Sequence, residues 1–185
     1  MYRINKIDYF IGVFLSTIIN SSKGVPALFD ETENSKRVEF STDTGDFNVY
    51  IKYTTKIRKS KVNIDSKKKN KISCNISFSD RDYEILKNSF VKENKENLIC
   101  LVCTNDKLNE TYMAVLTYED AMKCLEHRTN SGNRRITITR IGAEHDFNCY
   151  GVKFEEKDHI KCPVDCTQFL GLKENSEECT TVDVC

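Results

Sequence analysis

The strongest constraint in the sequence is a pair of apolar segments near the middle of the chain. Residues 98–103 read LeuIleCysLeuValCys, and residues 112–116 read TyrMetAlaValLeu after a polar connection that contains AsnAsp. A short, continuous apolar run bounded by turn residues is typical of a strand buried inside a sheet. The two segments therefore predict a pair of central strands.

Other segments add strands and helices in an irregular order. Strand patterns lie at residues 27–29, 37–40, 47–55, 72–78, 135–140 and 147–152, and the last two form a predicted hairpin. Helices are predicted at about residues 6–20, after Ser79 with Asp82 at the capping-box position, and at residues 118–127 after Thr117. The order predicts an α+β fold with a mixed, largely antiparallel sheet packed with about three helices.

Length and composition fit one domain. A chain of 185 residues, 39% of them hydrophobic, can bury one core of ordinary size. The C-terminal end has few periodic apolar positions and an excess of acidic residues. We therefore predict a single domain over residues 1–172 and an acidic, disordered tail over residues 173–185.

Nine cysteines are many for a chain of this length. Cys74 and Cys100 lie inside strand patterns and Cys124 lies in a helical pattern, where a free thiol packs as a small hydrophobic group. Cys100 and Cys103 have CxxC spacing, but residues i and i+3 of a strand point to opposite faces and cannot grip one ion. We predict mostly reduced thiols in a cytoplasmic protein, with a secreted, disulfide-stabilised protein as the alternative.

A second set of zinc-ligand residue types lies near the C-terminus: His159, Cys162, Cys166, Cys179 and Cys185. These residues lie in irregular chain, but their spacing does not fit a compact zinc knuckle. Phosphate-binding glycine loops, dinucleotide fingerprints and the HExxH zinc motif do not occur in the sequence. We therefore expect neither zinc nor a resident organic cofactor.

Positive charge is concentrated in one segment, although the chain as a whole has 28 basic and 28 acidic residues. Residues 52–71 contain nine basic residues and one acid, and the part from 56 to 71 is predicted to be a mobile loop. We expect this loop to contact the phosphates of DNA or RNA through Lys56, Arg58, Lys59, Lys61, Lys67, Lys68, Lys69 and Lys71. The alternatives are a solvated loop that balances an acidic body, or a loop that docks on the acidic C-terminal region of another copy of the chain. Partner subunits are therefore a second candidate for the partner of this loop. Nothing indicates a membrane as a partner.

Lys52 is the best candidate for a catalytic residue. It lies on the predicted strand 47–55, downstream of the acids Asp30, Glu31 and Glu33. An acid followed by a strand lysine resembles the PD-(D/E)-x-K nucleases, and this resemblance implies Mg²⁺ or Mn²⁺ between two carboxylates and a lysine that activates water. The second carboxylate is replaced by Tyr50, which implies a diverged or inactive member. The alternative is an ordinary strand lysine that reaches solvent.

The segments TyrIleLysTyrThrThr, SerPheSer, LeuValCys and LeuThrTyrGluAsp together resemble a family of small uncharacterised bacterial proteins over residues 7–155. The resemblance implies a bacterial, cytoplasmic protein, similar in kind to accessory proteins of mobile or defence loci, and it implies no activity. The combined prediction is a nucleic-acid-associated domain, noncatalytic or weakly catalytic, in a bacterial and defence-related system. A protein–protein interaction module with no nucleic-acid role is the alternative.

Overall fold

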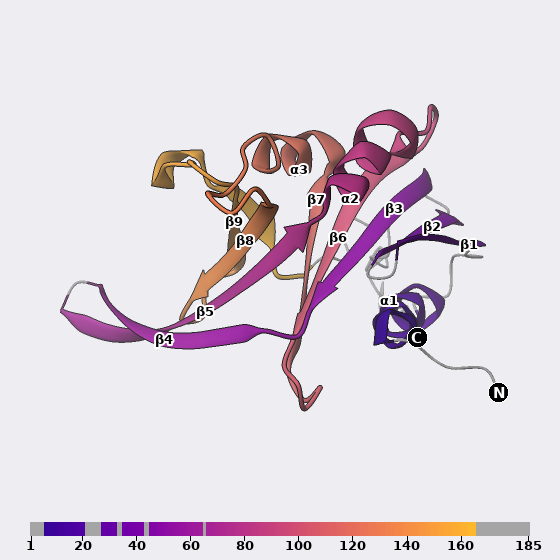
Figure 1. The fold of residues 1–185 in the computed structure, drawn as a ribbon. Coiled ribbons are helices and arrows are strands. Elements are labelled where there is room, and N and C mark those ends of the chain that lie inside the picture. Colours follow the sequence, from indigo (N-terminus) through magenta and orange to yellow (C-terminus); the bar gives the residue numbers. More distant parts are fainter. Residues whose placement is uncertain (1–5, 21–26, 33–34, 43–44, 65, 166–185) are drawn as a thin grey trace, which may run out of the picture.

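The first of two sheets runs through the middle of the molecule (Figure 1). The computed structural model describes residues 6–20, 27–32, 35–42, 45–64 and 66–165. The first sheet has the order β1-β2-β3-β6-β7, with β1 (Ala27–Thr32), β2 (Ser35–Thr42), β3 (Gly45–Thr54), β6 (Glu96–Thr104) and β7 (Thr111–Thr117). Its neighbours pair antiparallel except β3 and β6, which run parallel.

The second sheet is antiparallel throughout and has the order β10-β9-β8-β5-β4. Its strands are β4 (Ile57–Ile64), β5 (Lys67–Phe78), β8 (Arg134–Ile141), β9 (Asp146–Tyr150) and β10 (Ile160–Pro163). The chain enters this sheet from β3 and returns to the first sheet at β6. The connection between the two parallel strands therefore contains β4, β5 and the helical segment that follows them.

Helices cover the first sheet on one side and close the core on the other. α1 (Lys6–Asn20) packs Phe10, Ile11 and Phe14 against one face of the first sheet. The opposite face packs on the second sheet, together with α2 (Asp80–Ile85), the π-helical turn η1 (Leu86–Phe90) and α3 (Tyr118–Cys124). A short 3₁₀ turn, η2 (Glu156–Asp158), precedes β10.

The alternation of β3 divides its side chains between the two cores. Val49 and Ile51 belong to the cluster with α1, whereas Tyr50 belongs to the core between the sheets. Lys36 of β2 forms an ion pair with Asp8 of α1. The predicted α+β class and the largely antiparallel pairing are confirmed, and so is the opposite placement of Cys100 and Cys103, which belong to different cores.

The prediction of two central strands is half wrong. β6 is central, but β7 is an edge strand of its sheet. β7 is apolar because both of its faces are buried, with Ala114 and Leu116 in the core between the sheets and Val115 on the side of α1. A continuous apolar pattern therefore indicates that both faces of a strand are buried. It does not indicate how many strands pair with it.

The prediction of a mobile loop at residues 56–71 is also wrong. The segment forms β4 and the first half of β5, which pair from Ile57–Cys74 to Ile64–Lys67. Two residues connect the strands, and Ser66 has a φ of 62°, the left-handed conformation that tight hairpin turns require. Composition was misleading because backbone pairing can hold a strand whose side chains are mostly exposed to solvent. The predicted tail at residues 173–185 lies outside the described residues.

Candidate functional site: a basic ribbon and a polar groove

The distal half of the β4–β5 hairpin projects from the core. Lys67, Lys68, Lys69 and Asn70 are all exposed, although successive residues of a strand point to opposite faces. Both faces of the hairpin are therefore in solvent at this end. Figure 1 shows the two strands extending together beyond the other elements. We call β4 together with residues 67–71 the ribbon.

Strand register places basic residues on both faces of the second sheet, and six of them lie on the face that points away from the core. Opposite residues of paired strands share a face, so residues alternating with the buried Cys74, Ile76 and Phe78 form the outer face. By this register the outer face carries six basic residues: Arg58, Lys67, Lys69, Lys71, Arg135 and Lys161. Asp146 is the one acid among the described strand residues of that face.

Not every predicted phosphate contact is equally available. Lys59, Lys61 and Lys68 lie on the other face of the ribbon. The ammonium of Lys59 is 2.6 Å from Glu110 Oε2, and the hydrogen bond from Lys59 lowers the pKa of Glu110. Lys59 therefore fastens the base of the ribbon to the start of β7, although its side chain remains 65% exposed.

A polar groove opens where β3, β5 and α2 meet. It has a volume of about 860 Å³ and is lined by Lys52, Tyr53, Thr54, Lys56, Asn75, Ser77, Phe78, Ser79, Arg81, Asp82 and Asn133. Asn75 and Ser77 also belong to the outer face of the second sheet. The groove is therefore continuous with the outer face, and through it with the ribbon.

Lys52 and Asp82 form a buried ion pair in this groove. Lys52 Nζ lies 2.6 Å from Asp82 Oδ2, and the two side chains are 6% and 2% exposed. Strand alternation points Lys52 to the same side as Tyr50, away from α1. Asp82 reaches the pair from the first turn of α2, where it completes a capping box with Ser79.

Four donors saturate the Asp82 carboxylate. Its Oδ2 accepts from Lys52 Nζ, from Ser79 N at 2.7 Å and from Ser79 Oγ at 2.6 Å. Its Oδ1 accepts from the Tyr50 hydroxyl at 2.8 Å. Burial alone would raise the pKa of Asp82, but the hydrogen bonds from Lys52, Ser79 and Tyr50 lower it to about 2. Burial lowers the pKa of Lys52, and Asp82 opposes that change.

The structure brings Lys52 to an acid that the nuclease interpretation did not name. The backbone of Asp30 pairs with Lys36, so β2 lies between β1 and Lys52. Only the backbone of Asp30 and Glu31 is described, and Glu33 lies outside the described residues. Their contribution to a site with Lys52 stays a prediction.

The donor set of the groove does not fit the metal centre that the nuclease resemblance implies. Such a centre needs two carboxylates with free lone pairs. Among the described lining residues Asp82 is the one carboxylate, and its oxygens already accept four hydrogen bonds. We therefore derive no Mg²⁺- or Mn²⁺-dependent step from this groove.

The predicted C-terminal zinc ligands are only partly described. Cys162 is buried on β10, and its thiol donates to the Val115 carbonyl at 3.2 Å. The His159 ring stacks on Tyr150 with ring centroids 4.1 Å apart. Cys166, Cys179 and Cys185 lie outside the described residues, and within the described part of the chain no three His, Cys, Asp or Glu side chains could share a metal ion.

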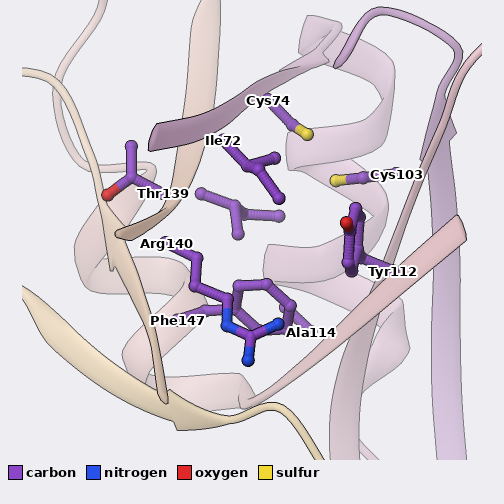
Figure 2. A pocket seen from close by; sticks show the side chains of 9 residues that line it. Ile72, Cys74, Cys103, Tyr112, Ala114, Thr139, Arg140 and Phe147 are labelled. Carbon is purple, nitrogen blue, oxygen red and sulfur yellow. The ribbon is translucent and has the colours of Figure 1, made fainter. Parts of the chain in front are cut away.

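A second cavity, between the two sheets, is small and apolar (Figure 2). Its volume of about 10 Å³ holds at most one water molecule. Figure 2 shows the sulfur atoms of Cys74 and Cys103 pointing toward each other at its edge, and a hydrogen bond between the two thiols lowers the pKa of Cys74 and raises that of Cys103. This cavity is a packing feature of the core.

Sequence reasoning missed several groups that the fold adds to the site. Arg81 and Asn133 line the groove, and Arg135 and Lys161 extend the outer face. The alternation of Arg135 with the apolar Ile136 was a local signal for an exposed cation on a strand. Asp82 was recognised as a capping residue, but its role as the partner of Lys52 had no local signal.

A scan of protein-family models, a search of curated proteins and a search of solved structures each find no match to this chain. The resemblances to a bacterial family and to PD-(D/E)-x-K nucleases therefore gain no support from these comparisons. No described helix is long and apolar enough to span a membrane.

Proposed function

We propose that this protein binds duplex DNA without sequence preference, through the ribbon and the outer face of the second sheet. The observation that carries the proposal is the projection of the ribbon with its cations on both faces. Six basic residues against one acid on the outer face give a surface complementary to a polyanion.

Shape favours DNA over double-stranded RNA. The major groove of B-DNA is about 12 Å wide and admits a two-stranded ribbon, whereas the major groove of A-form RNA is too narrow for side chains to enter. A ribbon of this length can enter the groove while the outer face contacts the flanking phosphates. Base stacking contributes little in this mode, because residues 57–64 and 67–71 of the ribbon include no aromatic side chain.

We propose a noncatalytic role, supported by the saturated carboxylate of Asp82. The bacterial and defence-related setting remains a proposal that rests on the sequence resemblance alone.

The free edge of β4 favours a second candidate, a protein–protein interaction module. β4 has one neighbour, β5, so one side of its backbone can pair with a strand from another protein. Lysines on an edge strand also protect proteins from unwanted edge pairing, and that role would explain Lys59 and Lys61 without any nucleic acid.

The test is the salt dependence of binding to a mixed-sequence DNA duplex, measured by fluorescence anisotropy. If the protein neutralises about four phosphates, the affinity should fall with log salt at a slope of about −3.6. Replacing Lys67, Lys68 and Lys69 with Gln should flatten the slope by about 2.7 and weaken all sequences alike. Thermal stability should change little, because these side chains are exposed.

The matched control replaces three exposed lysines outside the second sheet and the connections between its neighbouring strands β9 and β10: Lys87, Lys107 and Lys123. This control has the same net charge as the ribbon variant and should keep most of the wild-type slope. Equal effects of the two variants would show that the weaker binding comes from the lower net charge of the protein and not from the loss of ribbon contacts. No binding at low salt would leave the interaction module as the better proposal, and stronger binding to double-stranded RNA would contradict the choice of DNA.

A further inference from the structure

The ammonium group of Lys52 has unused hydrogen-bonding capacity at the floor of the groove. A lysine ammonium has three N–H donors. One is given to Asp82, and no other acceptor for Lys52 is found among the described residues. The nearby Phe78 ring, 5.4 Å from Nζ, adds a cation–π contact but accepts no conventional hydrogen bond. Two donors of a nearly buried cation are therefore left for a ligand.

The rim of the groove adds charge of the same sign. Lys56 and Arg81 line it and have no ion pair among the described residues. Neutral hydrogen-bond donors come from Asn75, Ser77 and Asn133. The opposite charges of Lys52 and Asp82 cancel each other. The lining therefore has a net positive charge and several donors, while its one carboxylate already accepts four hydrogen bonds.

We propose that the groove is a phosphate-binding site, in which Lys52 contacts the phosphate from the floor and Lys56 and Arg81 contact it from the rim. A phosphate offers several acceptor oxygens, which suits a lysine with two free donors and a guanidinium that can bind in a bidentate way. Asp82 acts as a positioning residue, because it holds the Lys52 side chain across the groove floor and supplies the counter-charge that keeps the ammonium protonated in a buried place.

The assignment of the phosphate to DNA rests on the proposed function, whereas the phosphate-binding site itself does not. The groove is continuous with the outer face at Asn75 and Ser77. A DNA strand bound to the outer face can therefore extend into the groove. The phosphate can come from the backbone of that strand, from its end, or from a free phosphate ester. All three share the chemistry that the lining recognises.

The first experiment is a calorimetric titration of the full-length protein with inorganic phosphate at low ionic strength. The wild type should bind, and replacing both Lys56 and Arg81 with Gln should weaken binding at least about tenfold. Both residues are exposed, so this variant should fold normally. A second variant, Lys52→Met with Asp82→Asn, removes the floor ammonium without leaving an unpaired buried charge and should also lose binding.

The control variant replaces Lys87 and Lys107 with Gln and should bind phosphate like the wild type. The ribbon variant of Lys67, Lys68 and Lys69 should also bind inorganic phosphate normally, which separates this inference from the proposed function. Absence of phosphate binding by the wild type, or unchanged affinity in the Lys56 and Arg81 variant, would overturn the groove site even if the ribbon binds DNA.

A second experiment compares duplexes with and without a 5′-phosphate. A preference for the phosphorylated end that disappears in the Lys56 and Arg81 variant would assign the groove to a terminal phosphate. Equal weakening of both duplexes would assign it to backbone phosphates. If the Lys56 and Arg81 variant loses binding of inorganic phosphate but binds both duplexes like the wild type, the groove is a site for a small phosphate ester. That result would overturn the connection between the groove and DNA.

Discussion

At the residue scale, the carboxylate of Asp82 connects the start of a helix with the middle of a sheet. It caps α2 through Ser79, and it holds Lys52 and Tyr50 of β3. A group that is deeply buried and still ionised must owe its charge to these donors. The stability that it contributes should therefore depend on pH.

We expect unfolding to become easier in acid because of Asp82. Its pKa is lowered from 3.8 to about 2, so its contribution is complete above about pH 4 and is lost as the pH falls toward 2. The size of the effect is roughly 2 kcal/mol. Denaturant unfolding between pH 2 and 6 measures it. Asp82→Asn should remove this part of the pH dependence, whereas Asp80→Asn, at an exposed position of the same helix, should retain it.

Lys52 shows why the candidate site was only half predictable. The alternating pattern predicted that Lys52 lies on a strand, and the capping pattern identified Asp82 as a helix-capping residue. Thirty residues of sequence separate Lys52 from Asp82. Their contact depends on how α2 packs against β3, and no local periodicity encodes that packing. The acids nearer in sequence were the natural guess, but the strand β2 intervenes between β1 and β3.

At the element scale, the turn after β9 allows a very close approach of the backbone to α3. A Cβ added at Gly151 would lie 2.0 Å from the carbonyl oxygen of Cys124. The residue at this position cannot carry a side chain unless α3 or β9 moves. The opposite case is Gly12 in α1, where an added Cβ meets nothing within 4 Å.

Gly151→Ala should destabilise the protein by about 3 kcal/mol or more, because the clash is with backbone and not with a flexible side chain. Gly12→Ala should stabilise it by roughly 0.5–1 kcal/mol, since alanine is the better helix former at an exposed position. Urea unfolding of both variants compares the two effects. A Gly151→Ala protein as stable as the wild type would contradict the close approach of the α3 backbone to Gly151.

Elements with buried faces were predicted well, and the ribbon was not. The strands β3, β6 and β8 and the helices α1, α2 and α3 lie close to their predicted positions, because each buries a periodic set of apolar side chains. The outer end of the ribbon buries almost no apolar side chains, so its sequence has no periodic apolar pattern. Its strands are specified by the pairing of β5 with β8 at the base and by the tight turn at the tip.

At the scale of the whole molecule, the core contains many thiols. The six cysteines of the described chain, Cys74, Cys100, Cys103, Cys124, Cys149 and Cys162, are all buried and form no disulfide. Thiols with so little exposure react slowly with soluble reagents until the fold opens. Their reactivity can therefore report on unfolding of the whole domain.

Thiol titration without reductant should show at least six groups that react only after denaturation. In the native protein these thiols should be protected, and their exposure should follow the same denaturant curve as the loss of secondary structure. Fewer reactive groups in the denatured protein, restored by a reductant, would mean disulfides and would favour the secreted alternative.

The parallel pairing of β3 with β6 also bears on the order in which the chain folds. The hairpins β4–β5, β6–β7 and β8–β9 join strands that are close in sequence, so they can form early. The β3–β6 contact must close a loop that contains the entire ribbon, α2 and η1. Because the entropy of that closure is lost before the contact is gained, the β3–β6 pairing is expected to form after these hairpins, and so is the pairing of β5 with β8, which joins residues still further apart in the sequence.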